Sequence, residues 1–338
     1  MTQTLFTETH TVLTPVSQED RRALGALPRT AQEHDAALAA TPCMTQVRVG
    51  GTAAHNFLAF PLTVAAWNLE RCLFPEDSAA MLAREGASLV LLSEMDNGMA
   101  RTAQRDTTGV IAAQLGMSFA YGVEFLELSL GGAIEKARAT DPENVLGHHG
   151  NAVLATVPLE RPVLIRLDRD DRWFRFDPAG EQDRIGGRVA IAARVQTEAG
   201  PILAVSTHLE SNALEDFRAG QMTALLDAID TLAGDMPVIL GGDMNTGNKM
   251  PDADWRTETL FGLAQDRGYE IHGGEAEAFT TRPSLITTAP PRRMKLDWFF
   301  IRGMDVAGSR IVPALRDDGT PLSDHELMIC EIRGPYRT

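Results

Sequence analysis

Short apolar runs alternate with longer amphipathic segments along most of the chain. Seven of the runs are too short for buried helices, and after the Gly50-Gly51 turn they predict buried strands at residues 62–67, 88–92, 152–155, 189–193, 202–206, 237–240 and 296–301. Helical spacing of apolar positions occurs between them, at residues 77–84, 102–115 and 213–232. This alternation predicts a layered α/β fold with a substantial sheet.

The region before the first of these strands has a different character. Residues 17–40 begin with a capping Ser17 and are rich in Ala, Leu, Glu and Arg, which predicts a helix with a polar face. We therefore expect residues 1–60 to form an N-terminal helical extension packed on the core and residues 61–338 to form the main domain. Residues 130–148 and 169–187 contain glycine, lack a clear period and predict inserted loops that shape specificity.

Composition narrows the class of protein. The 338 residues are 44% hydrophobic and 23% charged, which is typical of a globular protein with a sizeable core. The net charge of −15 argues against a protein that coats nucleic acid by broad electrostatic attraction. It does not exclude a nuclease, because a local basic stretch such as residues 161–188 can persist in an acidic chain.

Cysteine usage and the absence of membrane signals suggest a location. Cys43, Cys72 and Cys330 are scattered and form no CxxC pair, which favours free thiols in a reducing compartment. The first residues lack a basic start followed by an apolar stretch, and no apolar run is long enough for a transmembrane segment. We expect a cytoplasmic protein, and the sequence leaves its oligomeric state open.

Polar side chains capable of chemistry follow nearly every predicted strand. In layered α/β folds, side chains at strand ends converge on one rim of the sheet, where the rigid backbone positions them. The candidates are Asn68, Glu94, those in the segment His149 to Asn151, His208, Asp243, Asn245, Asp297, Asp324 and His325. Together they predict a site for a hard metal ion beside a phosphate.

Two of these segments, WNLE and SEMD, suggest the metal side of the site. Asn68 and Glu94 each come directly after an apolar strand, and Mg²⁺ needs few protein oxygens because it keeps several waters. Glu94 is the leading candidate for a direct ligand. Either residue taken alone is equally well explained as a turn residue that caps a strand.

The segment GGDMN suggests where the water and the phosphate bind. Its glycines would let the backbone and a ligand approach closely, and its D-x-N spacing places Asp243 and Asn245 on the same side of an extended segment. A turn closed by an aspartate side chain is the commoner use of such residues, so the pattern gains weight only from the other segments.

Acid–imidazole pairs suggest the groups that handle protons. His325 needs a carboxylate to fix its tautomer, and either Asp297 in KLDWFF or its neighbour Asp324 could serve. His208 in STHLES supplies a second imidazole, and two histidines beside one phosphodiester could stabilise the charged transition state. Each histidine alone is better explained as a satisfied core residue, and SDH alone as a cap.

Taken in order, seven segments resemble the signature segments of the endonuclease/exonuclease/phosphatase superfamily, from about residue 62 to residue 332. They are WNLE, SEMD, HGNAVLAT, STHLES, GGDMNT, KLDWFF and SDHE. Each is short and weak by itself, and their order makes the set specific. The resemblance implies a deoxyribonuclease I-like fold: a four-layer α/β sandwich with two central mixed β-sheets flanked by helices.

The resemblance also implies chemistry: divalent-metal-dependent hydrolysis of phosphate esters, with Mg²⁺ or Mn²⁺. By motif, the metal-side residues would be Asn68, Glu94 and Asp324, and the catalytic residues His208, Asp243, Asn245, Asp297 and His325. Asp243 would orient the attacking water, Asn245 would contact phosphate, and Asp297 would orient His325. These assignments imply in-line attack of water on phosphorus.

Two further residues are candidates for substrate binding. Asn151, in the G-N-A motif, would contact phosphate, although a structural turn role explains it at least as well. Arg188 would contact an anionic substrate, with a solvated surface position as the alternative. Tyr121 is expected to be an ordinary strand residue rather than a catalytic tyrosine.

The substrate is left open among phosphate esters: nucleic acid, a phospholipid headgroup or a small phosphodiester. His208 matches deoxyribonuclease I, sphingomyelinases and inositol polyphosphate phosphatases, which makes an apurinic endonuclease a poorer match. The segment THLES with Arg218 and Gln221 is most similar to the nuclease and tyrosyl-DNA phosphodiesterase branch. A catalytically inactive binding protein on the same fold is the opposing class, but no signature acid or imidazole is missing.

Overall fold

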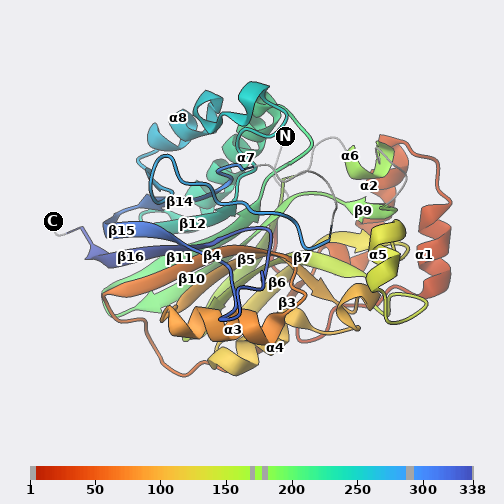
Figure 1. Cartoon of the computed structure of the whole chain (residues 1–338), viewed down its shortest axis with the longest axis horizontal. Coiled ribbons are helices and arrows are strands. Elements are labelled where there is room, and N and C mark those ends of the chain that lie inside the picture. The colour runs from red at the N-terminus through yellow and green to blue at the C-terminus, as the bar shows by residue number, and fades with distance from the viewer. Residues whose placement is uncertain (1–4, 168–171, 177–181, 287–292, 337–338) are drawn as a thin grey trace.

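The computed structural model describes residues 5–167, 172–176, 182–286 and 293–336, and two large mixed sheets form its centre (Figure 1). Among the described residues one sheet has seven strands in the order β1-β8-β10-β11-β12-β14-β13. Its strands are β1 (Leu5–Phe6), β8 (Leu159–Arg166), β10 (Val189–Thr197), β11 (Gly200–His208), β12 (Val238–Asp243), β13 (Glu270–His272) and β14 (Asp297–Arg302).

The second sheet has nine strands within the described ranges, in the order β15-β16-β4-β5-β7-β6-β3-β2, with β9 added beside β6. Its strands are β2 (Thr9–His10), β3 (Val47–Gly51), β4 (Leu62–Arg71), β5 (Leu89–Asn97), β6 (Ser118–Glu127), β7 (His148–Ala155), β9 (Arg184–Gly186), β15 (Met304–Val312) and β16 (Leu327–Pro335).

Helices cover the outer faces of both sheets (Figure 1). The α-helices are α1 (Gln18–Gly25), α2 (Ala31–Ala40), α3 (Pro75–Arg84), α4 (Thr107–Leu115), α5 (Ala133–Arg138), α6 (Arg172–Arg175), α7 (Glu215–Ala233) and α8 (Leu260–Gln265). Short 3₁₀ turns occur at Pro42–Met44, Ala100–Thr102, Pro251–Ala253 and Trp255–Thr257. None of the helices that the structure describes is long and apolar enough to cross a membrane.

Three apolar clusters hold the layers together. The middle cluster fills the space between the sheets with side chains such as Val64 and Ile239. A second cluster packs α2, α3 and α4 on the nine-stranded sheet, and a third packs α7 and α8 on the seven-stranded sheet. The expected four-layer α/β sandwich with two mixed sheets between helices is confirmed.

All seven strands expected from the apolar runs are present, and β4, β5, β7, β10, β11 and β12 extend beyond the predicted ranges. Two of these extensions matter for the site. β4 continues past Asn68 to Arg71, and β5 continues past Glu94 to Asn97, so both residues lie within strands rather than at their ends. The register of this pair shifts between Asn68 and Arg71, which marks a bulge that redirects the side chains.

Several helix predictions need correction. The helix expected at residues 17–40 is two helices, because Pro28 lies in the break between α1 and α2 and cannot continue a helix. The helix expected from residue 102 begins at Thr107, after Asp106 accepts a bond from the Gly109 amide as its cap. Both expected loops contain structure: α5 lies in residues 130–148, and α6 and β9 lie in residues 169–187, of which 169–171 and 177–181 are outside the described residues.

Residues before position 61 contribute to both sheets. β1 pairs with β8 of the seven-stranded sheet, whereas β2 and β3 continue the nine-stranded sheet beyond β6. This region therefore contains strands as well as α1 and α2, which take the place of the single expected helix. The domain boundary expected at residue 60 stays a prediction.

Candidate active site

Asp243 is the point at which the predicted site residues converge. One of its carboxylate oxygens, Oδ2, lies 3.1 Å from Asn68 Nδ2, 3.5 Å from His208 Nε2 and 3.6 Å from His325 Nε2. The other oxygen accepts a 2.8 Å bond from the backbone amide of Asn245. Strands from both sheets and the segment before β16 thus bring three polar side chains to one carboxylate, and the Asn245 backbone amide adds a fourth group.

The strand register explains why Asp243 lies where it does. β12 runs parallel to β11 and antiparallel to β14, which places Asp243 beside His208 on one side and Asp297 on the other. Gly242 has φ +143°, and a Cβ atom there would lie 2.0 Å from the carbonyl oxygen of Thr207. The glycine therefore serves the close approach of two strands, not the approach of a ligand.

His325 is held by the acid that the resemblance implied. Its Nδ1 lies 2.8 Å from Asp297 Oδ2, whereas Asp324 Oδ1 lies 4.0 Å from Nε2. Burial alone would lower the pKa of His325, but Asp297 and Asp243 outweigh it and raise that pKa well above its ordinary value. The imidazole is therefore a cation at neutral pH, with Nε2 directed toward Asp243.

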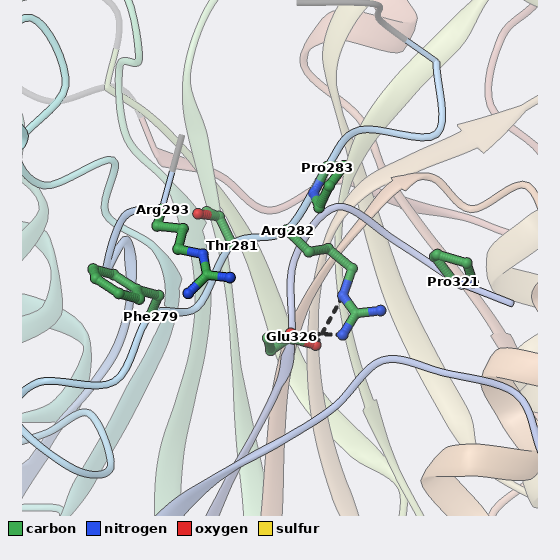
Figure 2. A pocket seen from close by; sticks show the side chains of 7 residues that line it. All are labelled: Phe279, Thr281, Arg282, Pro283, Arg293, Pro321 and Glu326. Carbon is green, nitrogen blue, oxygen red and sulfur yellow. Dashed lines mark hydrogen bonds and ion pairs between the residues drawn. The ribbon is translucent and has the colours of Figure 1, made fainter. Parts of the chain in front are cut away.

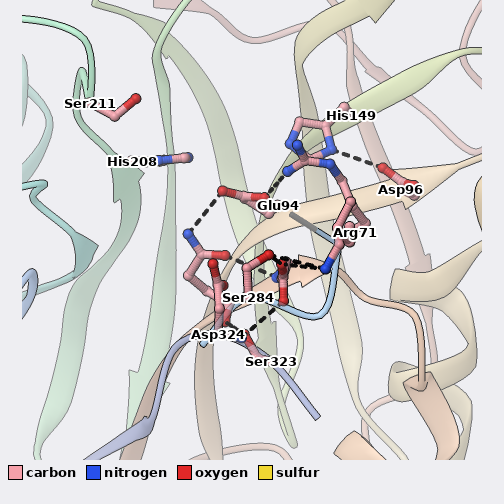
Figure 3. Close-up of polar contacts among 12 residues, drawn as sticks. Arg71, Glu94, Asp96, His149, His208, Ser211, Ser284, Ser323 and Asp324 are labelled. Atoms are coloured by element: carbon pink, nitrogen blue, oxygen red, sulfur yellow. Dashed lines mark hydrogen bonds and ion pairs between the residues drawn. The ribbon is translucent and has the colours of Figure 1, made fainter. Parts of the chain in front are cut away.

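Glu94 is close to Asn68 and is engaged by an arginine that the sequence did not single out (Figure 3). Asn68 Nδ2 donates to Glu94 Oε1 at 3.1 Å, and Arg71 Nη1 donates to Glu94 Oε2. Burial would raise the pKa of Glu94, but the ion pair with Arg71 holds it well below its usual range. Glu94 is thus an anion with a resident cationic partner.

Asp324 completes an acidic edge next to Glu94. Its backbone amide donates to Glu70 Oε2 at 3.1 Å, and its side chain is 29% exposed. Burial raises the pKa of Asp324 to about 8, with the charges of Glu70 and Glu94 adding to it against the opposing charge of His325. Carboxylates this crowded repel one another, and a divalent cation would relieve the repulsion.

The residues present therefore fit a hard divalent metal. Carboxylate oxygens dominate the donor set, as Mg²⁺ and Mn²⁺ require. Among the described residues, potential ligand atoms of Asp243, Asp297 and His325 also lie within 4.8 Å of one another. This group differs from the predicted metal set of Asn68, Glu94 and Asp324. Because Asp297 already bonds Nδ1 of His325, we favour the acidic edge of Glu94 and Asp324 as the place where the metal binds.

Asn68 itself presents donors to the site. Its Oδ1 accepts from the backbone amide of Glu70 at 3.0 Å, so its amino group faces Glu94 and Asp243. Asn245 is similarly committed, because Nδ2 donates to the Leu209 carbonyl at 2.9 Å and Oδ1 accepts from Asn248 at 2.5 Å. In this arrangement the side-chain amides of Asn68 and Asn245 position their neighbours. The metal role of Asn68 and the phosphate role of Asn245 stay predictions.

Arg188 lies beside His208 and is neither solvated nor exposed. It is 4% exposed, its Nη1 lies 2.5 Å from Glu124 Oε1, and its Nε lies 3.3 Å from Glu210 Oε2. The same Nη1 is 2.9 Å from His208 Nδ1. The expected alternative of a solvated surface residue is wrong, because the two buried carboxylates keep the guanidinium inside.

Asn151 is fully buried in β7. Its Nδ2 donates to the Val189 carbonyl at 2.9 Å, which ties β7 to β10 of the other sheet, and its Oδ1 has no hydrogen-bond partner among the described residues. Tyr121 is a buried strand residue, as expected, with its hydroxyl donating to the Met95 carbonyl. His149 bonds Asp96 and lies close to Arg101, and Arg101 joins this pair through Glu135 to Arg71 beside Glu94.

Several charged residues around the site were not singled out from the sequence. They are Glu70, Arg71, Asp96, Arg101, Glu124, Glu135 and Glu210. Glu70, Asp96 and Glu210 lie inside WNLE, SEMD and STHLES, and Arg71 directly follows WNLE, so membership of a motif was the available signal. Glu124 lies in β6, which no apolar run had predicted.

The fold places the chain in the class of four-layer α/β sandwiches with a polar cluster at one rim of the sheets. The sequence profile described as the Endonuclease/Exonuclease/phosphatase family matches residues 65–325, and the chain belongs to that family. Members of the family act on phosphate ester bonds and generally depend on divalent metals. A sequence search of curated proteins found no match.

Solved structures support the fold. An endonuclease/exonuclease/phosphatase from Beutenbergia cavernae shares 18% identity, covers 81% of this chain and 72% of its own, and superposes with a TM-score of 0.59. The human Nocturnin catalytic domain with bound sulfate shares 16% identity, with coverages of 85% and 96% and a TM-score of 0.54. D. rerio TDP2 complexed with a single-strand DNA product shares 14%, with coverages of 80% and 98% and a TM-score of 0.54.

Proposed function

We propose that the protein is a divalent-metal-dependent phosphodiesterase that hydrolyses P–O ester bonds by in-line attack of water. The observation that carries the proposal is the convergence of Asn68, His208 and His325 on Oδ2 of Asp243. An anion held between two imidazoles is well placed to orient a water through a hydrogen bond. Loss of any signature residue would favour an inactive binding protein, and none is lost.

Each side chain has a part in the proposed reaction. Asp243 orients the attacking water, and cationic His325 stabilises the charge that develops on the phosphoryl oxygens. His208, fixed between Arg188 and Asp243, faces the same charge. Glu94 and Asp324 would hold Mg²⁺ or Mn²⁺, which when bound would neutralise the phosphate and ease departure of the ester oxygen. Asn245 and Asn151 are proposed phosphate contacts.

Two cavities of about 540 Å³ suggest the substrate, because Glu326 of the SDHE motif lines one and Asn212, directly after STHLES, lines the other. The first, shown in Figure 2, is lined by Arg282, Arg293, Glu326 and Phe279, and the amide of Arg282 donates to the Asp324 carbonyl at 2.8 Å. The second is lined by Arg172, Lys249, Asp216 and Phe217.

In the first cavity Arg282 pairs with Glu326, which leaves Arg293 as a further cation, and in the second Arg172 and Lys249 lie with Asp216; each cavity also has an aromatic ring. This surplus of positive charge favours a substrate with anionic groups beyond the scissile phosphate. A nucleic-acid strand, as processed by nucleases and tyrosyl-DNA phosphodiesterases, has that form. A phospholipid headgroup or an inositol phosphate is the alternative, and the expected cytoplasmic location stays a prediction.

Hydrolysis of bis-p-nitrophenyl phosphate with and without Mg²⁺ tests the proposal. Asp243→Asn and His325→Gln should each lower kcat/KM by about 10²-fold or more, because general acid–base groups contribute roughly that factor. Exposed Asp235→Asn and His55→Gln are matched controls and should leave the rate unchanged. Equal rates in all five proteins would refute the catalytic assignment.

A substrate panel then separates the branches. Single-stranded oligonucleotide, sphingomyelin vesicles and inositol polyphosphate would be compared with each divalent metal. Preference for the oligonucleotide is expected. The charge reversals Arg293→Glu and Lys249→Glu should raise its KM, because each places an anion in a cavity with a surplus of positive charge.

A further inference from the structure

Arg71 pairs with Glu94, although a carboxylate that binds a metal is expected to have no cationic side chain as a partner. Its Nη1 contacts Glu94 Oε2 directly (Figure 3), and its Nε lies 3.6 Å from Glu135 Oε1 on α5. The Arg71 and Glu94 side chains are each only 17% exposed. One guanidinium therefore spans two carboxylates, of which one belongs to the proposed metal edge and the other does not.

The backbone supports a special role for this pair. Glu70, Arg71 and Cys72 have φ of 43°, 75° and 57°, and Glu94 has φ of 58°. Non-glycine residues avoid this left-handed region, and a run of three beside a fourth is an unusual concentration of strain. The strain accompanies the register shift in the β4–β5 pair and aims Arg71 and Glu94 at each other.

Glu135 is fixed in a position to accept Arg71. Arg101 Nη1 lies 3.1 Å from Glu135 Oε2, and Arg101 also forms a two-pronged pair with Asp96 at 2.7 and 2.8 Å. The Arg101, Asp96 and Glu135 side chains are at most 7% exposed. Glu135 therefore remains in place whichever way the guanidinium of Arg71 turns.

A second chain of contacts joins α5 to the same edge. Arg138 donates to the carbonyl of Leu285, whose amide donates to Glu70 Oε2 at 2.9 Å. Glu70 in turn accepts from the backbone amide of Asp324 at 3.1 Å. Helix α5 thus touches both sides of the acidic edge, through Glu135 toward Glu94 and through Arg138 toward Asp324.

The geometry points to Arg71 as a resident counter-cation of Glu94, which a divalent metal must displace onto Glu135. Without a metal, the guanidinium neutralises Glu94. A doubly charged ion at Glu94 would repel the guanidinium of Arg71. Rotation toward Glu135 would keep Arg71 paired with a carboxylate. The inference rests on the proposed metal-dependent function and adds two positioning residues, Arg71 and Glu135, that tie metal affinity to α5.

Titration of the full chain with Mn²⁺ alone, by calorimetry, tests this without any substrate. Arg71→Gln should tighten the dissociation constant by about fivefold or more, because an ion pair that is mostly withdrawn from water no longer competes with the metal. Exposed Arg84→Gln makes the same change of charge away from the site and should leave it unchanged. Weaker or equal binding in Arg71→Gln would overturn the inference.

Glu135→Gln gives a second readout that does not depend on the first variant folding. It should weaken Mn²⁺ binding by about fivefold, because the displaced Arg71 loses its acceptor, and more than exposed Glu143→Gln does. In an Arg71→Gln background this loss should disappear. An equal loss in both backgrounds, or a loss no larger than that of Glu143→Gln, would overturn the proposed displacement of Arg71 from Glu94 onto Glu135. Absence of Mn²⁺ binding in every protein would instead overturn the metal-dependent function itself.

Discussion

Asp297 lies behind His325, with Oδ2 2.8 Å from Nδ1, so that the imidazole presents Nε2 to Asp243 at 3.6 Å. The acid comes from the start of β14 and the imidazole from the segment before β16, two elements of different sheets. The two sheets must therefore keep their relative position for the pair to form. That requirement links the stability of the middle apolar layer to the proposed chemistry.

Replacing Asp297 by Asn should separate the orientation of His325 from the effect of the Asp297 charge on it. The amide keeps the shape but can no longer stabilise an imidazolium, so kcat should fall by about 10²- to 10⁴-fold with little change in KM. Steady-state hydrolysis of bis-p-nitrophenyl phosphate measures both constants, with exposed Asp235→Asn as the matched control. A normal kcat in Asp297→Asn would show that this contact is only structural.

Arg188 should matter for stability as well as for the site. Arg188→Met leaves Glu124 and Glu210 buried without their cation, which should lower the free energy of unfolding by about 3–5 kcal/mol. Urea unfolding measures the change, and Arg22→Met, 75% exposed, should cost less than about 0.5 kcal/mol. Adding Glu124→Gln to Arg188→Met should recover part of the loss. No recovery would contradict the assigned pairing.

Gly242 should tolerate no side chain. Gly242→Ala forces a Cβ to within 2.0 Å of the Thr207 carbonyl oxygen at φ +143°, which should destabilise the protein by more than the roughly 1–3 kcal/mol of backbone strain alone. Gly220 in α7 has open space around it, and Gly220→Ala should stabilise by about 0.5–1 kcal/mol. Thermal unfolding of the two variants should therefore shift in opposite directions. Equal shifts would refute the packing argument.

His148 should make the protein sensitive to acid. Burial, with the nearby charges of Arg21 and Arg48, lowers its pKa to about 3, and neither ring nitrogen has a partner among the described residues. A histidine with a lowered folded pKa contributes stability above its unfolded pKa near 6.5 and loses it as pH falls toward 3. At pH 5 the loss from this group is about 2 kcal/mol relative to pH 7.5.

The comparison of His148→Gln with the parent protein at those two pH values measures this effect. The amide cannot titrate, so the difference in unfolding free energy between pH 7.5 and pH 5 should shrink by about 2 kcal/mol. Exposed His55→Gln should leave that difference unchanged. An undiminished acid sensitivity in His148→Gln would mean that other groups cause it.

Seven buried strands were predictable because their apolar runs are short and uniform. Buried β6 was not, because Gly122 and Glu124 interrupt its apolar residues, and the edge strands β15 and β13 were not, because half-exposed residues hide their period. Motif order supplied Asp297 as the partner of His325, which the residues alone left undecided. The ion pairs of Arg71 and Arg188 could not be foreseen, since their carboxylate partners come from elements distant in sequence, such as α5 and β6.

Residues 5–10 join both sheets, because β1 lies at the edge of one and β2 at the edge of the other. Shortened forms that begin at residue 61 would expose the edge of β8 and the part of β6 that pairs with β3, with their unpaired backbone groups. They would also lose Arg21, 2% exposed, whose Nη2 donates to the Asn144 carbonyl at 2.6 Å. The amino-terminal region thus covers sheet edges that could otherwise pair with another copy of the chain. It should be retained for expression and crystallisation.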